Sequence, residues 1–168
     1  MALVIRNIRE DDCQIISDCF KQQGWNKPVS QYRKYYSEHM SGKRTVLVAF
    51  TNDDFAGYLT IVWSSDYPWF KQNDIPEIMD LNVLKKYWRR GIATRLMDKA
   101  EQLIAQKSNQ AGIGVGLTGD YGPAQILYLK RGYIPDGKGI SQNEKYLNRG
   151  DKVTVDDDLI LCLTKNLV

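Results

Sequence analysis

Residues 81–96, LNVLKKYWRRGIATRL, join a short apolar run to two lysines, two aromatic residues, two arginines and a glycine, and then begin an amphipathic helix. The first four N–H groups of a helix have no acceptor within it, and the helix dipole adds partial positive charge there. A glycine before the helix lets the backbone approach a ligand closely. The stretch therefore predicts an anion site, for phosphate above all, at the start of the helix. Taken alone, it is equally typical of a solvated turn.

The segments around this stretch predict alternating strands and helices. The helix runs over Ile92–Lys107, and the strand before it over Glu77–Leu84. Arg44–Phe50 and Phe55–Trp63 form a predicted hairpin, because polar turn residues separate them. Further predicted elements are strands over Leu3–Ile8, Ile113–Leu117 and Asp156–Thr164, a helix capped by Glu10, Asp11 and Asp12, helices over Pro28–Met40 and Pro123–Lys130, and an irregular loop over Ser64–Pro76. This order predicts one α/β (α+β) domain over residues 1–168, with a mixed sheet.

The composition is that of a globular protein. The 168 residues carry 23 basic and 20 acidic side chains, a net charge of +3, which is too balanced to indicate nucleic-acid binding. Cys13, Cys19 and Cys162 have no metal-ligand spacing and cannot all pair, so free thiols in a reducing compartment are expected. The first residues are too charged for a signal peptide, and no apolar run reaches the ~20 residues that span a bilayer. We therefore expect a cytoplasmic protein with no membrane partner and no metal.

Two motifs carry a resemblance to a known family. Residues 81–83 and 88–93, LNV and WRRGIA, resemble the acetyl-CoA-binding signature of the GNAT superfamily of N-acyltransferases, Leu-x-Val followed by Gln/Arg-x-x-Gly-x-Gly/Ala. Residues 124–133, AQILYLKRGY, are similar to the family's later motif, Asn-x-x-Ala-x-x-Leu-Tyr-x-Lys-x-Gly-Phe. Trp88 stands where Gln or Arg is usual, and Tyr121 where Asn is usual. The order and separation of the motifs match, and the resemblance covers nearly the whole chain.

The resemblance implies a fold, a cosubstrate and a binding site. The implied fold is a central, mixed but mostly antiparallel sheet of about six or seven strands flanked by about four helices. The implied cosubstrate is acetyl-CoA, whose pantetheine arm runs as a pseudo-strand beside Leu81 and Val83, with a backbone N–H near Val83 for the oxyanion. The residues expected to hold its pyrophosphate, mostly through backbone amides, are Arg89, Arg90, Gly91, Ile92, Ala93 and Thr94. A bacterial source is also implied.

Two carboxylates and one tyrosine are candidates for proton transfer. A primary amine with a pKa of ~10 is mostly protonated at neutral pH, so a base is expected. Glu77 occupies the place where some members of the family carry a general-base glutamate, while Asp80 is the alternative base or orients the substrate ammonium. Their spacing puts them on opposite faces of a regular strand unless a bulge intervenes. Tyr128 occupies the family's general-acid place, and packing beneath its helix is the alternative role.

The acceptor is the least defined part of the prediction. In this fold the segments that carry Trp25, Tyr32 and Trp63 wall the acceptor cleft, so these aromatic residues and Asp80 are weak candidates for substrate contact. Each aromatic residue can instead belong to the core. We expect direct acetyl transfer to the primary amine of a small molecule. The alternatives are a protein N-terminus, a lysine, an aminoacyl-tRNA, or a sensor that binds acyl-CoA without turnover, and a homodimer is left open.

Two other features carry little functional weight. Residues 114–119 spell Gly-x-Gly-x-x-Gly, but the segment before them is polar and the glycines interrupt the strand, so a dinucleotide site is not expected. The alternating glycines indicate instead the close approach of a neighbouring chain or a ligand. His39, the only histidine, is expected on a helix surface, because no partner for zinc binding or nucleophilic catalysis accompanies it.

Overall fold

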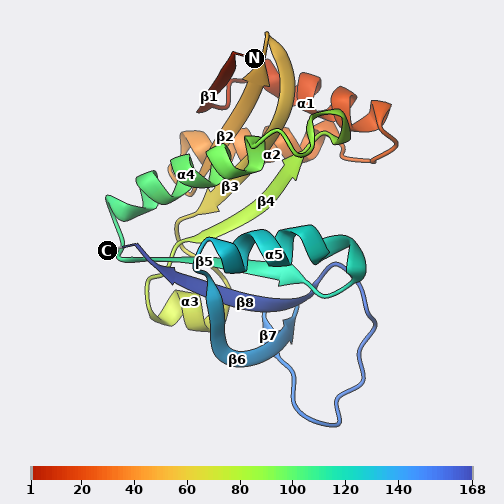
Figure 1. Cartoon of the computed structure of the whole chain (residues 1–168). Coiled ribbons are helices and arrows are strands. Elements are labelled where there is room, and N and C mark those ends of the chain that lie inside the picture. The colour runs from red at the N-terminus through yellow and green to blue at the C-terminus, as the bar shows by residue number, and fades with distance from the viewer. Residues whose placement is uncertain (1, 168) are drawn as a thin grey trace. The chain divides into compact units, whose positions relative to one another are not determined.

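The computed structural model describes residues 2–167, which form eight strands and five α-helices (Figure 1). Contacts group them into two compact units: residues up to Trp63 with Ile78–Leu103, and Ser64–Glu77 with residues from Ile104 onward. The strands are β1 (Leu3–Asn7), β2 (Arg44–Thr51), β3 (Asp54–Val62), β4 (Glu77–Val83), β5 (Gln110–Gly116), β6 (Ile134–Gln142), β7 (Lys145–Tyr146) and β8 (Leu159–Asn166). The α-helices are α1 (Asp12–Gln22), α2 (Val29–Met40), α3 (Pro68–Gln72), α4 (Ile92–Ala105) and α5 (Gly122–Lys130). The prediction of one domain over residues 1–168, whose end residues lie outside the described part, stays a prediction.

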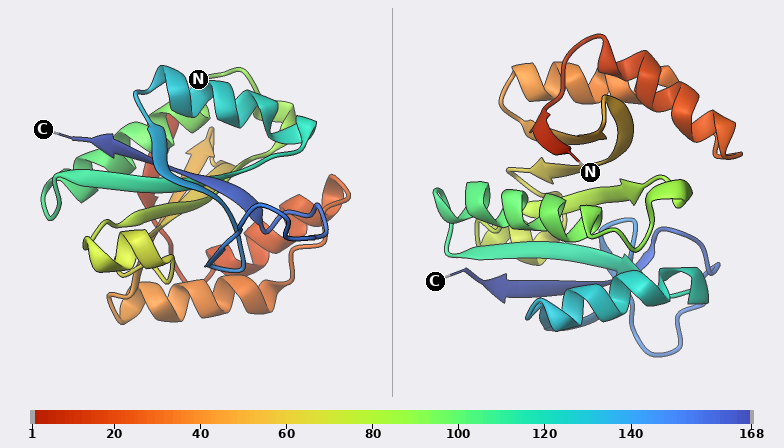
Figure 2. Two further views of the ribbon diagram at one scale, coloured as in Figure 1. Left: turned by 90° about the horizontal axis from the view of Figure 1, so that it is seen from below. Right: turned by 45° about the horizontal axis from the view of Figure 1, so that its top comes forward.

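The first unit contains strands in the order β1-β2-β3-β4. β1, β2 and β3 pair antiparallel, with Arg44 opposite Val62 in the β2–β3 pair. The predicted hairpin is confirmed, and Asn52 and Asp53 form its turn at φ angles of 50° and 68°. Asparagine and aspartate tolerate this left-handed conformation better than most residues. α1 and α2 lie side by side, and α2 also contacts β2 (Figure 2).

The start of α1 differs from the predicted acidic cap. The helix begins at Asp12, which supplies the predicted negative charge in the first turn, but no side chain caps that turn. The Asp12 carboxylate instead accepts hydrogen bonds from both terminal nitrogens of Arg6, at 2.7 and 2.9 Å, and from the backbone N–H of Arg9 at 2.6 Å. This charge-assisted pair joins the helix start to β1.

Aromatic side chains form the centre of the first unit's core. Phe20 of α1 and Tyr32 of α2 both pack edge-on against Tyr58 of β3, with ring centroids 5.9 and 5.4 Å apart. All three residues are fully buried. The Tyr32 hydroxyl donates to the Tyr58 hydroxyl at 3.4 Å, so these polar groups pair within the core.

His39 lies half-buried at the end of α2, not on the helix surface as its sequence context predicts. Its Nδ1 accepts a hydrogen bond from the backbone N–H of Val46 at 3.1 Å. Burial lowers the pKa of His39, which keeps the ring neutral and able to accept this bond. The histidine therefore ties α2 to β2.

The second unit contains strands in the order β5-β8-β6-β7, paired antiparallel. β5 carries Gly112, Gly114 and Gly116 on one face, and a methyl group on any of them would lie under 3.0 Å from a neighbouring side chain. These neighbours are the rings of Phe70 and Tyr121 and the side chain of Ile160. The alternating glycines therefore accommodate side chains of the same chain, through the close approach that the sequence predicts.

Three elements of the second unit are missing from the sequence-based prediction. α3 interrupts the segment predicted as an irregular loop, and its Phe70 is fully buried. β6 escapes the alternation pattern because Gly137 and Gly139, at φ +81° and +77°, break the pairing register within it. β7 has only two residues, too few for a pattern. The described residues thus contain eight strands where about six or seven were expected, and five α-helices where about four were expected, and the predicted mixed α/β fold class is confirmed.

Among residues 2–167 no helix combines the length and the apolar character that a membrane span requires. Within the same residues no three His, Cys, Asp or Glu side chains are grouped so that they could hold a metal ion. Cys13, Cys19 and Cys162 are free thiols, and the first and last of them are buried.

Candidate active site

The connection between β4 and α4 has the geometry of an anion site. Gly91 stands at φ +77° just before the helix, and a side chain there would point into open space. The backbone N–H of Arg95 makes the first helical bond, to the carbonyl of Gly91 at 3.0 Å. The N–H groups of the preceding residues, Ile92 to Thr94, are therefore the first-turn donors that have no acceptor within the helix. These donors and the exposed glycine fit a diphosphate, which needs close approach and several N–H contacts.

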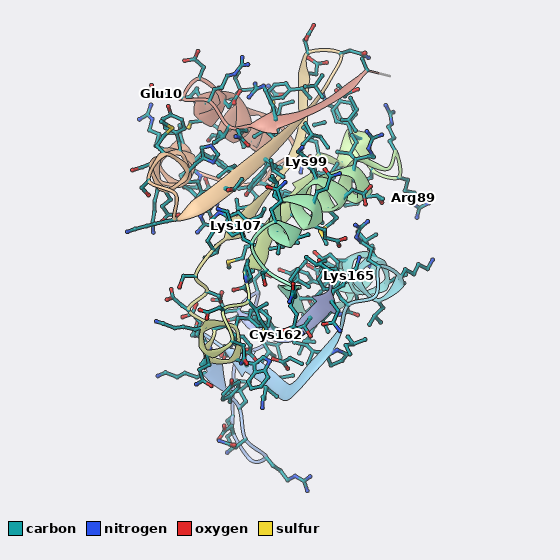
Figure 3. All side chains as sticks on the ribbon, turned by 90° about the vertical axis from the view of Figure 1, so that its left-hand side faces the viewer. Glu10, Arg89, Lys99, Lys107, Cys162 and Lys165 are labelled. Atoms are coloured by element: carbon teal, nitrogen blue, oxygen red, sulfur yellow. The ribbon has the colours of Figure 1, made fainter. Side chains whose placement is uncertain are left out.

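The arginine side chains of this connection are exposed and lie beside the donors. Arg89 has a left-handed φ of +58°, and Arg90 follows it on the surface. Figure 3 shows the Arg89 side chain pointing away from the helix. The guanidinium of Arg90 lies 5.5 Å from the ring centroid of Tyr87. The arginines therefore add positive charge around the opening, while the backbone supplies the donors.

Trp88, the departure from the family signature, contributes a side-chain hydrogen bond. Its indole N–H donates to the carbonyl oxygen of Val83 at 2.7 Å. Gln and Arg, the usual residues at this place, also carry side-chain N–H donors. Trp88 closes the turn that leads from the end of β4 to the helix, and more than half of its surface stays exposed.

β4 contains the bulge on which the placement of its carboxylates depends. Asp80 lies within the strand at φ +56°, which breaks the regular alternation of side chains. Beyond the bulge, β4 runs very close to Gly57 of β3, where a methyl group would lie 2.6 Å from the Asn82 carbonyl oxygen and 3.0 Å from the Val83 Cα. The backbone N–H of Leu84 also bonds to the Ala56 carbonyl at 2.8 Å. The segment from Leu81 to Val83 is therefore held tightly against β3.

The Asp80 carboxylate is already engaged by two neighbours. It accepts a hydrogen bond from the Tyr35 hydroxyl at 2.8 Å and lies 3.7 Å from an Arg44 nitrogen. Burial, and then the charge of Asp80, raise the pKa of Tyr35, so the tyrosine stays protonated and donates. Neither Tyr35 nor Arg44 has a local sequence signal for this role, because they come from α2 and β2.

Glu77 is a buried carboxylate of the second unit, with only 7% of its surface exposed. Its Oε2 accepts a hydrogen bond from the Ser65 hydroxyl at 2.6 Å, and that hydroxyl accepts one from the Tyr67 backbone N–H at 3.0 Å. Burial, with the charge of Glu77 as the next cause, raises the pKa of the Cys162 thiol to about 12. Glu77 is therefore a fixed carboxylate, and Ser65 is a neighbour that sequence reasoning missed.

Tyr128 lies in α5 with 6% of its surface exposed. Burial raises its pKa to about 12, so it is protonated at neutral pH. Its ring lies 6.2 Å from that of Tyr133, and within the described part of the chain its hydroxyl makes no hydrogen bond. The hydroxyl is therefore free to donate to a ligand.

Tyr121 stands where the family motif has asparagine, and its role there is to pack against the end of β5. Its ring lies over Gly116, and its hydroxyl donates to Asp157 at 2.9 Å. The side-chain amide of Gln125, one turn later, donates to the Gly116 carbonyl at 2.9 Å. A side-chain amide thus does contact the end of β5, but it comes from α5, where no motif position indicates it.

The aromatic candidates for acceptor contact occupy different environments. Tyr32 is a fully buried core residue of the first unit, as described above, and is not accessible to a ligand. Trp25 is half-buried, stacks on Phe20 with centroids 5.7 Å apart, and has the Lys85 ammonium 5.3 Å from its ring. Trp63 donates its indole N–H to Thr45 at 3.0 Å. Of these three, Trp25 is joined to the β4–α4 connection.

Gln23 is a further residue that the sequence did not single out. Its side-chain oxygen accepts a hydrogen bond from the backbone N–H of Lys85 at 3.0 Å. The α1–α2 loop is thereby tied to the connection before α4. The first unit brings together this loop, Asp80, Leu81–Val83 and the residues from Trp88 to Thr94, whereas Glu77 and Tyr128 belong to the second unit.

Comparison with known families identifies the class of protein that these motifs define. The model of the Acetyltransferase (GNAT) family matches residues 9–133, which is most of the chain. The protein therefore belongs to the GNAT family of acetyltransferases. A search of curated proteins finds no match.

Solved structures share the fold over nearly their whole length. An N-acetyltransferase from Staphylococcus aureus Mu50 has a TM-score of 0.74 at 14% identity, with 100% of both chains covered. A chimera of the spermidine N-acetyltransferase from Vibrio cholerae with hSSAT has a TM-score of 0.71 at 12% identity, with 99% and 96% covered. The ribosomal-protein-S18-alanine N-acetyltransferase from Escherichia coli has a TM-score of 0.70 at 11% identity, with 99% and 94% covered. At these identities the likeness shows the mixed α/β GNAT fold alone.

Proposed function

We propose that the protein transfers an acetyl group from acetyl-CoA directly to the primary amine of a small molecule. The observation that carries the proposal is the β4–α4 connection, where Gly91 exposes the first-turn N–H groups of α4. Membership of the acetyltransferase family supports the reaction class. The free thiols support a reducing, cytoplasmic setting.

In this proposal the backbone holds the donor. The pyrophosphate binds the N–H groups between Arg89 and Thr94, where the dipole of α4 favours negative charge. The pantetheine arm lies along Leu81 to Val83. A backbone N–H near Val83 stabilises the oxyanion that forms when the amine attacks the thioester carbonyl.

Tyr128 acts as the general acid. The leaving thiolate of CoA has a pKa near ~8.5 by analogy with cysteine, which is below the pKa of about 12 of buried Tyr128, so the proton transfer is uphill and the tyrosinate must regain a proton afterwards. The support is the protonated hydroxyl of Tyr128, a buried residue, which has no other partner among residues 2–167. The proton moves from this hydroxyl to the departing sulfur as the carbon–sulfur bond breaks.

Glu77 is proposed as the general base, acting through a water molecule. Most of a primary amine is protonated at neutral pH, and the ammonium must lose a proton before attack. Both carboxylates have partners: Glu77 accepts from Ser65, and Asp80 accepts from Tyr35 and lies 3.7 Å from Arg44. The choice of Glu77 over Asp80 rests on its place in the family motif, where some members carry a general-base glutamate.

The proposed acceptor is a small cationic amine, because the side chains near β4 suit a positively charged group. Trp25 and Tyr35 offer half-buried aromatic faces, and Asp80, which already pairs with Tyr35 and Arg44, leaves 29% of its side chain exposed. Cation–π and ion-pair contacts of this kind suit an alkyl ammonium. Spermidine and an alanine of ribosomal protein S18, the acceptors named for two of the structural relatives, belong in the test as a small and a macromolecular amine.

The test has two parts. Calorimetry with acetyl-CoA measures binding, and release of free CoA thiol measures turnover across a panel of polyamines, amino sugars, lysine, N-terminal peptides and aminoacyl-tRNA. We expect binding and turnover of a small amine. Turnover of a peptide or aminoacyl-tRNA alone would replace the small-molecule assignment, binding without thiol release on any amine would indicate a sensor, and no binding would overturn the proposal.

A further inference from the structure

We propose that Tyr35 and Arg44 are positioning residues that hold Asp80 in its left-handed conformation and thereby fix the strand segment that receives the acetyl group. The inference rests on the proposed function and concerns how its strand is kept in place. Asp80 then serves as an anchor and not as a proton acceptor.

The conformation of Asp80 needs support from its surroundings. It lies in the middle of β4 at φ +56°, which costs free energy for any residue other than glycine. Aspartate tolerates this region better than most residues because its short side chain bonds locally. Here the side chain bonds instead to other elements, so the conformation is held by tertiary contacts.

Contacts hold Asp80 and the backbone on each side of it. The Tyr35 hydroxyl donates to its carboxylate at 2.8 Å. The Thr60 hydroxyl lies 3.4 Å from the carbonyl oxygen of Met79, just before Asp80. The side-chain amide of Asn82, just after it, donates to the Asp80 carbonyl at 3.2 Å. The bulge is therefore fixed from α2, from β3 and from β4 itself.

Arg44 joins these contacts into one network. One terminal nitrogen donates to Thr60 at 2.8 Å and lies 3.7 Å from Asp80, while its Nε donates to Glu38 at 2.6 Å. The guanidinium carbon lies 4.2 Å from the ring centroid of Tyr35. The side chain is only 14% exposed, so its charge interacts strongly with both carboxylates. Arg44 thus orients the Tyr35 ring and, at the same time, compensates the negative charge of Asp80.

The network acts on the segment that the proposed mechanism uses. Leu81 to Val83 follow the bulge directly, and their far end is fixed by the indole of Trp88 on the Val83 carbonyl. Because a left-handed residue redirects the chain after it, a shift of Asp80 would turn the N–H groups that follow. An oxyanion contact tolerates little displacement, so loosening the bulge lowers the rate more than it weakens coenzyme binding.

The test combines three conservative variants with a matched control. Tyr35→Phe keeps the ring and removes the donor, and we expect kcat to fall about tenfold with the acetyl-CoA KM nearly unchanged. Asp80→Asn keeps a side chain that tolerates a positive φ and accepts from Tyr35, so kcat falls less than about threefold and the pH–rate profile is kept. Asp80→Ala removes the anchoring side chain, and we expect its kcat to fall at least about tenfold. Tyr36→Phe, on the same helix, leaves kcat unchanged.

Two results would overturn the proposal. A kcat in Tyr35→Phe equal to that of the wild-type protein would show that the network does not contribute to catalysis. Equal inactivity of Asp80→Asn and Asp80→Ala, with loss of the acidic limb of the pH–rate profile, would make Asp80 a proton acceptor instead.

Hydrogen exchange of the backbone amides at residues 80–83 tests the anchor without turnover. We expect faster exchange in Tyr35→Phe than in Tyr36→Phe, and equal exchange would overturn the anchor itself. Failure of the wild-type protein to bind acetyl-CoA would instead overturn the proposed function, and with it the catalytic meaning of the anchor. Melting temperatures of all variants identify any that do not fold.

Discussion

The indole N–H of Trp88 donates a hydrogen bond to the carbonyl oxygen of Val83 at 2.7 Å, across the turn that joins β4 to α4. The bond spans the region between the strand proposed for pantetheine and the loop proposed for pyrophosphate. It also accounts for an unusual residue in the family signature, because the usual Gln or Arg and the observed Trp all donate through a side-chain N–H. The bond leaves that oxygen less available to a ligand.

Replacing Trp88 by Phe tests the value of this bond. The ring is kept and the donor is lost, and a hydrogen bond of about 1 kcal/mol corresponds to about a fivefold change in an equilibrium constant. We expect the Kd for acetyl-CoA to rise about fivefold, measured by calorimetry. Trp88→Gln, which restores a donor, should bind more tightly than Trp88→Phe. Binding by Trp88→Phe that is as tight as or tighter than that of Trp88→Gln would show that the N–H is not what matters.

Gly91→Ala tests whether the backbone at the start of α4 receives the diphosphate. Gly91 and Gly150 share a strongly positive φ, +77° and +94°, and open space where a side chain would go. Alanine at either position therefore costs a similar amount of folding free energy, about 1 kcal/mol. Gly150→Ala is the matched control for strain, since only Gly91 lies in the β4–α4 connection.

We expect Gly91→Ala to raise the Kd for acetyl-CoA at least about tenfold and Gly150→Ala to leave it unchanged. With S-acetylpantetheine, which lacks the diphosphate, the two variants should have equal KM values. Similar losses of acetyl-CoA binding in both variants would mean that strain alone is responsible.

Tyr128→Phe tests the general acid. Because burial raises the pKa of Tyr128 to about 12, the hydroxyl stays protonated, and kcat should not decline through this group between about pH 7 and about pH 10. Loss of the hydroxyl should lower kcat about 100-fold with little change in the KM for acetyl-CoA. Tyr146→Phe, which alters an exposed tyrosine, serves as the control. Undiminished turnover in Tyr128→Phe would exclude the role.

Glu77→Gln tests the general base while keeping the volume and the oxygen that accepts from Ser65. The rate should fall and the acidic limb of the pH–rate profile should disappear, because that limb reports protonation of the base. The rate of CoA thiol release, measured at several pH values, reports both effects. An acidic limb that persists in Glu77→Gln but vanishes in Asp80→Asn would transfer the role to Asp80.

The sequence predicted what is local and contiguous. The β4–α4 connection is one uninterrupted motif whose proposed function lies in its backbone, so glycine position and helix start were enough to predict it. The β2–β3 hairpin was likewise visible, because its turn residues and its two apolar runs adjoin. α3 and β6 were missed because a five-residue helix and a strand broken by glycines have too little periodicity.

Contacts between distant segments could not be predicted in this way. Tyr35, Arg44 and Asp80 come from three elements, and nothing in their local patterns pairs them. Tyr32 and Tyr35 lie on the same helix with the same side chain, yet one is fully buried and the other reaches a carboxylate. Residue type identified candidates for the wall of the acceptor site. Only their burial in the structure distinguished core residues such as Tyr32 from residues that remain accessible.

The pH dependence of folding stability should carry a contribution from His39. Its Nδ1 accepts from Val46, and burial lowers its pKa below the ordinary 6.5, so the folded state favours the neutral ring. As the pH falls, the unfolded chain takes up this proton first. The stability that His39 supplies is therefore complete above about pH 6.5 and is lost as the pH falls through the lowered pKa.

The free energy of unfolding, measured with urea at several pH values, should decrease between about pH 7.5 and about pH 5. His39→Gln keeps an acceptor oxygen and does not titrate, so its decrease should be smaller, while the contribution of the carboxylates is common to both proteins. At the higher pH the two proteins should differ by no more than about 1 kcal/mol, the value of one hydrogen bond. Parallel pH profiles would show that His39 keeps its proton equilibrium unchanged on folding, contrary to the burial of its ring.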